Sequence, residues 1–136
     1  MNNLATIKQI FTFKTIAVVG LSPKPERPSY RVAAYLQSVG YRIIPVNPGQ
    51  DTILGEKCYA SLTDIPEPVA VVDVFRRSEF VPAITEKAIA IGAKALWLQD
   101  GVIAPEAAQI AEAAGLLVVM NDCMFRRHRQ LYPAPD

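Results

Sequence analysis

Five short runs of hydrophobic, mostly β-branched residues recur along the chain, separated by segments in which apolar residues follow a helical spacing. The runs are almost continuously apolar, which is the pattern of strands that are buried on both faces of a parallel sheet. They cover Thr15–Gly20, Arg42–Val46, Ala70–Phe75, Ala95–Gln99 and Leu117–Met120. Alternating strands and helices predict an α/β fold, a single Rossmann-like doubly wound domain with a mainly parallel five-stranded sheet.

The segments between these runs carry helix start and stop signals. Three helices have clear ends: Ser29–Ser38 before Gly40, one with Ser78 as N-cap and Gly92 at its end, and one from Pro105 to Gly115. Shorter helices are expected over Asn2–Phe11, around Ser61–Ile65 and over Met124–Leu131. The remainder of Gly49–Pro68, rich in Gly, Pro and Asp, is expected to be loop.

Composition narrows the class of protein. The 136 residues suit one domain, 1–136, with a core of about 14–121. A net charge of +1 argues against a nucleic-acid binder, and no apolar run is long enough to cross a membrane, so we expect a soluble, cytoplasmic protein. Cys58 and Cys123 belong to no metal-binding motif, and we expect no metal site. The basic cluster Arg126–Arg129 is expected to form a solvated helix face.

The end of the first predicted strand carries the strongest functional signal. Gly20 allows a tight turn, and a polar loop containing Lys24 and Arg27 leads into a helix that starts near Ser29. Strand, glycine, loop and helix in this order place backbone N–H groups and a positive helix end where a phosphate can bind. In a doubly wound sheet the ligand lies at the carboxyl ends of the strands, so the pattern predicts a nucleotide or phosphate ligand there.

Two common nucleotide sites do not match. A dinucleotide site requires G-x-G-x-x-G in the first loop and an acidic residue at the end of the second strand. Here the loop has only Gly20, and the second strand ends in Asn47 and Pro48. No G-x-x-x-x-G-K-[ST] motif for ATP occurs either.

Several motifs taken together resemble the small stand-alone CoA-binding protein family, a Rossmann-like domain similar to the CoA-binding domain of the succinyl-CoA synthetase α subunit. The matching segments are Val18–Ser29 (V-V-G-L-S-P-K-P-x-R-P-S), Ile44–Pro48 (I-P-V-N-P), Ile53–Tyr59 (I-L-G-E-K-C-Y), Val72–Arg77 (V-D-V-F-R-R) and Asn121–Met124 (N-x-C-M). They occur in order over nearly the whole chain. The resemblance implies that the chain binds coenzyme A or an acyl-CoA, and it makes a homodimer plausible.

The resemblance also implies which residues contact the ligand. The first loop would hold the diphosphate, and the residues after the second strand would shape the nucleoside side, where an acidic residue would repel the 3′-phosphate. The residues after the later strands would line the rest of the cleft. The full set is Gly20, Leu21, Ser22, Lys24, Arg27, Ser29, Tyr30, Asn47, Pro48, Phe75, Arg76, Gln99, Gly101 and Asn121.

Three further residues bear on the function. Asp122 stands where many relatives carry a basic residue, and it would weaken binding if it faced the phosphates. Cys123 could lie near the thiol end of the ligand, although packing is the simpler role for this side chain. His128, the only histidine, has no partner at a recognisable motif spacing, so we expect it at the surface or at a helix terminus rather than in catalysis.

Three functions are therefore compared. The resemblance favours a CoA-binding protein with no catalytic residues of its own. The alternatives are a small NAD(P)-dependent oxidoreductase and an interaction module that has lost its ligand, for which Asp122 is the supporting feature.

Overall fold

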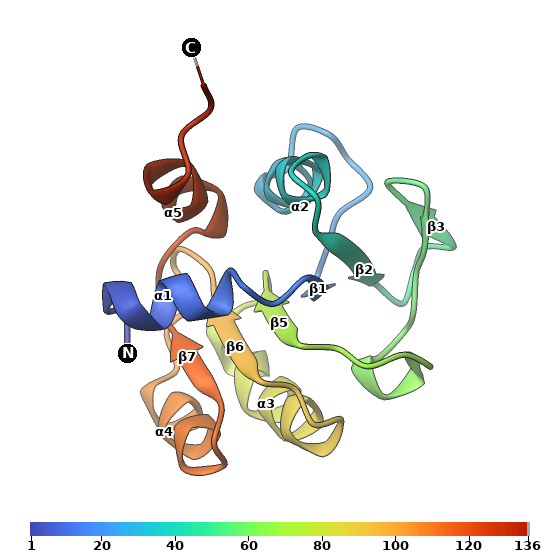
Figure 1. Ribbon diagram of the computed structural model, residues 1–136. Coiled ribbons are helices and arrows are strands. Elements are labelled where there is room, and N and C mark those ends of the chain that lie inside the picture. The colour runs from blue at the N-terminus through green and yellow to red at the C-terminus, as the bar shows by residue number, and fades with distance from the viewer. Residues whose placement is uncertain (136) are drawn as a thin grey trace.

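The computed structural model describes residues 1–135 and is built around one parallel sheet (Figure 1). The sheet strands are β1 (Thr15–Val19), β2 (Arg42–Val46), β5 (Val71–Val74), β6 (Ala95–Leu98) and β7 (Leu117–Val119). They lie in the order β2-β1-β5-β6-β7, and every neighbouring pair is parallel. The predicted five-stranded α/β fold is confirmed, and the sheet is parallel throughout.

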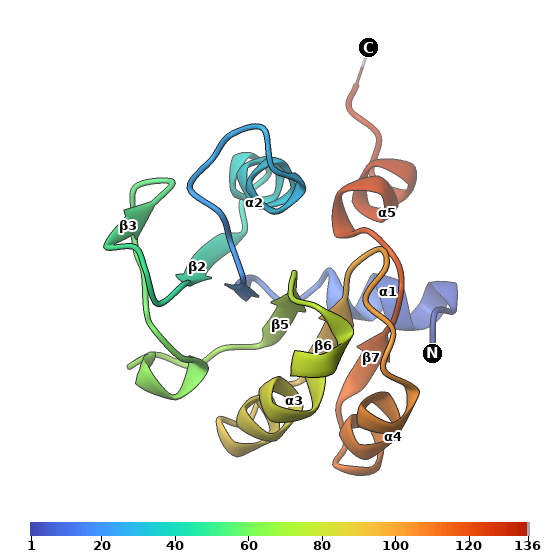
Figure 2. The ribbon, with the colours of Figure 1, turned by 180° about the vertical axis from the view of Figure 1, so that it is seen from behind.

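Helices cover both faces of the sheet, as Figures 1 and 2 show from opposite sides. On one face lie α1 (Leu4–Ile10), α2 (Pro28–Ser38) and α5 (Met124–Leu131), and on the other lie α3 (Val81–Ala90) and α4 (Pro105–Ala113). Alternate residues of each strand therefore enter two separate apolar clusters. Ile16 and Val18 of β1 enter the cluster beneath α2, and Ala17 and Val19 enter the one beneath α3.

The strand order fixes where a ligand can bind. The chain moves outward from β1 to β2 on one side and then returns to β5 on the other, so the order reverses between β1 and β5. At such a reversal the loops that follow the two strands diverge, which opens a crevice at their carboxyl ends. The loops that begin at Gly20 and at Phe75 meet at this point.

The connection from β2 to β5 contains no long helix. It holds the hairpin β3 (Thr52–Ile53) and β4 (Glu56–Lys57), followed by the short 3-10 helix η1 (Leu62–Asp64). The short helix agrees with the prediction around Ser61–Ile65, whereas the hairpin was not predicted. Its two turn residues, Leu54 and Gly55, have φ values of 55° and 75°, a combination that favours a tight hairpin but that leucine rarely adopts.

The prediction that Ser78 caps the next helix is wrong. The chain first forms a 3-10 turn, η2 (Ser78–Phe80), and α3 starts only at Val81 with no side-chain cap. The Ser78 hydroxyl oxygen instead accepts a hydrogen bond from the Ile103 backbone N–H at 2.9 Å. This contact ties the loop after β5 to the loop after β6.

Candidate functional site

Gly20 lies at the centre of the crevice, where two loops approach each other closely. Its N–H donates to the Val46 carbonyl at 3.0 Å, and its φ is +87°. A Cβ atom here would lie 2.6 Å from the Phe75 carbonyl oxygen and 2.9 Å from Cδ of Arg76. Both the backbone conformation and the space therefore require glycine at this position.

The loop after Gly20 is held by its own hydroxyl groups. The Ser22 N–H donates to the Ser29 hydroxyl oxygen at 3.0 Å, and the Lys24 N–H donates to the Ser22 hydroxyl oxygen at 3.1 Å. α2 then begins at Pro28, so the unpaired N–H groups of its first turn face the loop. The loop and the start of α2 enclose a cavity of about 350 Å³ lined by Gly20, Ser22, Lys24, Arg27, Pro28, Ser29 and Phe75.

This cavity has a positive electrostatic character. Lys24 and Arg27 are exposed, and neither forms a salt bridge with any residue in the described range 1–135. None of the residues in 1–135 that line the cavity carries a carboxylate. Two unpaired cations beside a helix N-terminus favour a bound anion, and charge-assisted contacts with phosphate oxygens are among the stronger hydrogen bonds in proteins.

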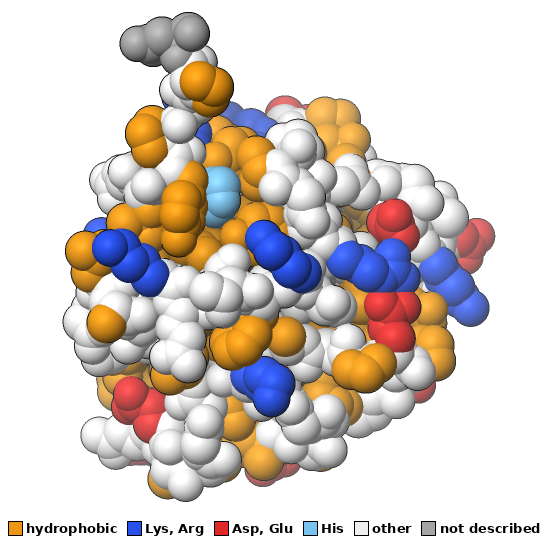
Figure 3. Space-filling model, in the orientation of Figure 1, with side chains coloured by type: hydrophobic (Ala, Val, Ile, Leu, Met, Phe, Trp, Pro, Cys, Tyr) orange, Lys and Arg blue, Asp and Glu red, His pale blue; other side chains and the backbone are white. Residues whose placement is uncertain are grey.

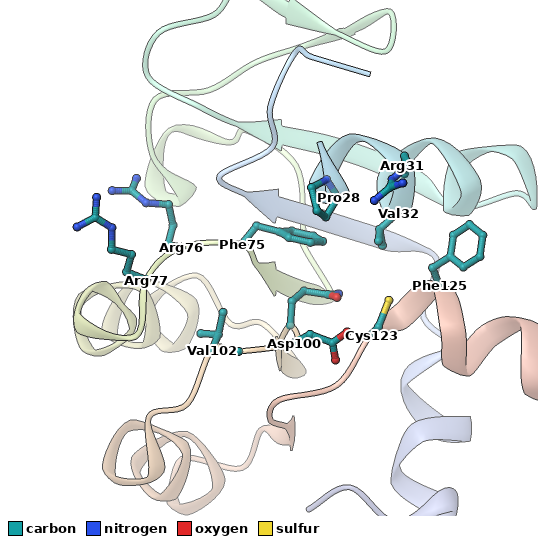
Figure 4. A pocket seen from close by; sticks show the side chains of 12 residues that line it. Pro28, Arg31, Val32, Phe75, Arg76, Arg77, Asp100, Val102, Cys123 and Phe125 are labelled. Carbon is teal, nitrogen blue, oxygen red and sulfur yellow. The ribbon is translucent and has the colours of Figure 1, made fainter. Parts of the chain in front are cut away.

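A larger cavity of about 690 Å³ adjoins the first, because Phe75 and Pro28 line both. It lies between the α2 and α5 ends of the site (Figure 4), and Phe75 projects into it while Arg76 and Arg77 point away to the other side. Its walls are mainly apolar, with a few polar groups. The complete lining is Pro28, Arg31, Val32, Phe75, Arg76, Arg77, Gln99, Asp100, Gly101, Val102, Cys123 and Phe125.

A third cavity of about 170 Å³ lies on the α3 side of the crevice, and Arg76 links it to the large one. Pro48, Ser61 and Lys87 contribute to its walls. The Arg76 guanidinium lies 4.4 Å above the Phe80 ring, so this cation is oriented by an aromatic face rather than by a carboxylate.

Four of the residues expected to contact the ligand lie outside the walls of the three cavities, in the core or in hydrogen bonds between loops. Asn47 donates to the Leu21 carbonyl at 2.9 Å and accepts from the Gly49 N–H at 2.9 Å, so its amide joins the loops after β1 and β2. The Leu21 side chain is fully buried in the core. Tyr30 lines none of the three cavities, and Asn121 accepts a hydrogen bond from the Gly101 N–H at 2.8 Å outside their walls.

The remaining expected residues come together. Gly20, Ser22, Lys24, Arg27, Ser29 and Phe75 share the cation-lined cavity; Phe75, Arg76, Gln99 and Gly101 share the large one; and Pro48 lies in the third. Arg31 and Val32 were not predicted. Their signal was present in the sequence, because residues three and four positions after Pro28 lie on the same face of a helix that starts there.

A buried carboxyl group lies beneath the large cavity. Asp73 is fully buried in β5, and its Oδ1 accepts a hydrogen bond from Nε2 of Gln99 at 2.6 Å. Its Oδ2 has no hydrogen-bond partner among residues 1–135. Burial raises the pKa of Asp73 from 3.8 to about 7, and the Gln99 hydrogen bond offsets part of this effect.

Asp122 does not face the cation-lined cavity as an uncompensated charge. Its carboxylate is buried, and it accepts hydrogen bonds from Arg126 at 2.9 Å, from Arg127 at 2.8 Å and from the Cys123 N–H at 2.9 Å. Arg126 also forms a two-pronged ion pair with Asp100. Arg126 and Arg129 are exposed, as predicted for a solvated face, but Arg126 and the partly buried Arg127 also pair with carboxylates. These pairs account for Asp122, the feature that favoured a lost ligand site.

His128 is in the last turn of α5, which is the helix-terminus position that the sequence allowed as an alternative to the surface. Its ring is buried in an aromatic cluster with Phe11, Tyr41 and Tyr132, and the Tyr35 hydroxyl lies 2.7 Å from its Nδ1. Figure 3 shows the histidine surrounded by hydrophobic side chains. Burial, followed by the charge of Lys14, lowers the pKa of His128.

Neither a metal cluster nor a membrane span is found in residues 1–135. No three His, Cys, Asp or Glu side chains of that range come together to hold a metal ion. None of its helices is long and apolar enough to cross a membrane.

Comparison with known proteins identifies relatives over most of the chain. Residues 14–129 match the family model described as CoA binding domain. The uncharacterized protein YneT of Bacillus subtilis is 43% identical over 125 residues, which is 91% of this chain and 93% of that protein. The ADP-forming acetate–CoA ligase II of Archaeoglobus fulgidus is 32% identical over 90 residues, which is 65% of this chain but only 13% of the ligase.

Solved structures with the same fold show the same two kinds of relative. A hypothetical protein from Pyrococcus horikoshii OT3 superposes with a TM-score of 0.90 at 44% identity, covering 93% of this chain and 90% of that one. The dinucleotide-forming acetyl-coenzyme A synthetase 1 of Ca. Korarchaeum cryptofilum superposes with a TM-score of 0.74 at 25% identity. That match covers 85% of this chain and 28% of the synthetase.

Proposed function

Since this chain belongs to the CoA-binding domain family, we propose that it binds coenzyme A or an acyl-CoA in the crevice between β1 and β5, without catalysing a reaction itself. The observation that carries the proposal is the cavity at Gly20, where two exposed cations that pair with no carboxylate of residues 1–135 lie beside the first turn of α2. The diphosphate of the ligand would occupy this cavity, because backbone N–H groups and both cations can reach it.

The two flanking cavities match the two ends of such a ligand. The mainly apolar walls of the large cavity suit the pantetheine arm, with Phe75 and Val32 against its carbon atoms. The third cavity, with Arg76, Lys87 and Pro48 in its walls, suits the nucleoside and its 3′-phosphate. The strand end at Asn47 has no carboxylate that would repel this phosphate.

Two observations support the proposal that the chain does not catalyse a reaction: the position of its histidine and the small part of the enzymes that it matches. The only histidine is buried among aromatic rings rather than in a cavity wall. The matched region makes up only a small share of the acetate–CoA ligases and of the acetyl-CoA synthetase. The proposed function is therefore binding, with any chemistry left to a partner protein.

Isothermal titration with CoA, 3′-dephospho-CoA and NAD tests this proposal. We expect CoA to bind most tightly, the dephospho analogue about 10-fold more weakly because it loses one charge-assisted contact, and NAD not to bind. Folded protein that is free of co-purified ligand and gives no heat with CoA would rule the proposal out. Binding of NAD in preference to CoA would favour the oxidoreductase alternative instead.

A further inference from the structure

The side chain of Gln99 is held in one orientation beneath the large cavity. Gln99 is 3% exposed and lines that cavity, and its Nε2 donates to Asp73 Oδ1 at 2.6 Å. Above its pKa of about 7 the Asp73 carboxylate can only accept hydrogen bonds, which holds the nitrogen of the Gln99 amide towards it. The amide oxygen, Oε1, is consequently turned away from Asp73.

This amide oxygen is the unusual feature of the cavity. Oε1 of Gln99 has no hydrogen-bond partner in the described part of the chain, although the rest of the side chain is buried. It is also not among the polar atoms that are sealed off from solvent without a partner, which are Oδ2 of Asp73 and Oγ1 of Thr85. Oε1 is therefore open to the cavity, and it can accept a hydrogen bond from a donor group that enters there.

The environment of this pair explains why the orientation is stable. Asp73 lies in register between Val18 of β1 and Trp97 of β6, neither of which carries a charge. Trp97 already donates its Nε1–H to the Asp122 carbonyl at 2.9 Å. Gln99 is then the one side chain in the described range that donates to the Asp73 carboxylate.

We infer that Gln99 is a specificity-determining residue of the large cavity, whose Oε1 accepts a hydrogen bond from an N–H group of the ligand and which Asp73 holds in position. This inference rests on the proposed function, because the pantetheine arm of CoA supplies such donors in its two secondary amides. The remaining walls of the cavity are mainly apolar, so Gln99 distinguishes an amide-containing arm from a purely hydrocarbon chain of the same length.

The test compares CoA with two analogues in which one or the other pantetheine amide is replaced by an ester, which removes a single N–H donor. Adenosine 3′,5′-bisphosphate, which lacks the arm, serves as the reference ligand. Wild-type protein should bind CoA about 10-fold more tightly than one of the esters, as expected for one buried hydrogen bond. Equal affinity for CoA and both esters overturns the inference without any variant being made.

The variant Gln99→Met completes a double-mutant cycle, since methionine fills a similar volume but offers no amide oxygen. It should bind CoA about 10-fold more weakly than wild type and bind CoA and the ester with equal affinity. Its affinity for adenosine 3′,5′-bisphosphate should not change. If CoA loses affinity but the preference for amide over ester survives, Oε1 is not the acceptor.

The positioning role of Asp73 is tested with Asp73→Asn at a pH above the pKa of Asp73, about 7, where the wild-type carboxylate can only accept. An asparagine amide can donate as well as accept, so the Gln99 amide can then take both orientations. The preference for CoA over the ester should fall to about threefold or less, while binding of adenosine 3′,5′-bisphosphate is unchanged. A full preference in this variant overturns the role of Asp73. Failure of the wild-type protein to bind either CoA or the bisphosphate would instead remove the proposed function, and this inference with it.

Discussion

Two pairs of basic side chains, one at the start of α2 and one at the start of α5, are held in opposite ways. In the loop between β1 and α2, Lys24 and Arg27 are exposed and form no salt bridge with any described residue. At the start of α5, Arg126 and Arg127 pair with the carboxylates of Asp100 and Asp122. The first region keeps its charge available for a ligand, whereas the second uses its charge to fix the end of the fold.

The difference shows that a count of charges does not locate an anion site. Both regions contain two cations close to a helix start, but among residues 1–135 only the cations of the loop form no salt bridge, although Glu26 lies between them in the sequence. An arginine already held by two carboxylates gains little from a phosphate, because it would have to give up equivalent contacts. Whether a cation is already paired with a carboxylate therefore decides whether it is available to bind a phosphate.

The largest effect is expected from a substitution that displaces the loop between β1 and α2 and leaves its two cations in place. Gly20→Ala should weaken CoA binding by about 100-fold or more, because its Cβ would overlap the Phe75 carbonyl and φ is +87°. Titration calorimetry measures the effect. Gly115→Ala is the matched control, with φ +94° and no atom within 4 Å of the added Cβ. It should lose stability but not affinity, and a folded Gly20→Ala protein with normal affinity would show that the loop position is unimportant.

Removing the unpaired cations is the next largest change. The double variant Lys24→Ala/Arg27→Ala should bind CoA about 30-fold more weakly, because two charge-assisted contacts with phosphate oxygens are lost. Its melting temperature should stay within about 1 °C of wild type, since neither side chain has a salt bridge in the described fold. Arg129→Ala, at an exposed arginine of α5, should leave affinity unchanged. Equal losses in both variants would point to a general charge effect.

Removing a paired cation should have the reverse effect. Arg127→Ala should lower the free energy of unfolding by about 2 kcal/mol, because the buried Asp122 carboxylate loses a charged donor at 2.8 Å. Urea titration measures this, and CoA affinity should change little. The control Arg77→Ala breaks a pair with Glu79 in which both side chains are mostly exposed, and it should cost no more than about 0.5 kcal/mol. Similar costs in both variants would contradict the structural role of Asp122.

The buried carboxyl of Asp73 offers the test that depends most on pH. Its pKa is raised to about 7, so the folded state holds the proton more tightly than the unfolded state does. The associated stability is complete below about pH 4 and is lost as pH rises through about 7. Measured against Asp73→Asn by thermal unfolding, wild-type stability should fall by about 1 kcal/mol or more between pH 4 and pH 8. A constant difference would show that Asp73 does not titrate in this range.

The sequence was sufficient to predict the sheet because its strands are continuous apolar runs. Each predicted strand lies within two residues of the observed one, and the glycine, serine and cations of the first loop are brought into one cavity. The β3–β4 hairpin was missed because each strand has only two residues, and because Leu54 adopts a positive φ that its side chain gave no reason to expect.

Contacts between distant segments could not be predicted in the same way. The pairing of Asp73 with Gln99 depends on the register of β5 and β6, and the burial of His128 depends on how α5 packs against Phe11 and Tyr35. Leu21 and Tyr30 belong to the binding loop and the start of α2 in sequence, but Leu21 is buried in the core and Tyr30 packs against the same cluster. Periodicity identifies an element, whereas tertiary packing decides which of its residues remain accessible.

The three prolines of the first loop have a consequence for the kinetics of binding. Pro23, Pro25 and Pro28 fix three φ angles in a segment of six residues, and the Ser22–Ser29 hydrogen bond closes its two ends. The loop is therefore already ordered before an anion binds, so binding costs little conformational entropy. Its association rate should be set by diffusion and by the field of Lys24 and Arg27, falling as salt is added, while the dissociation rate changes much less.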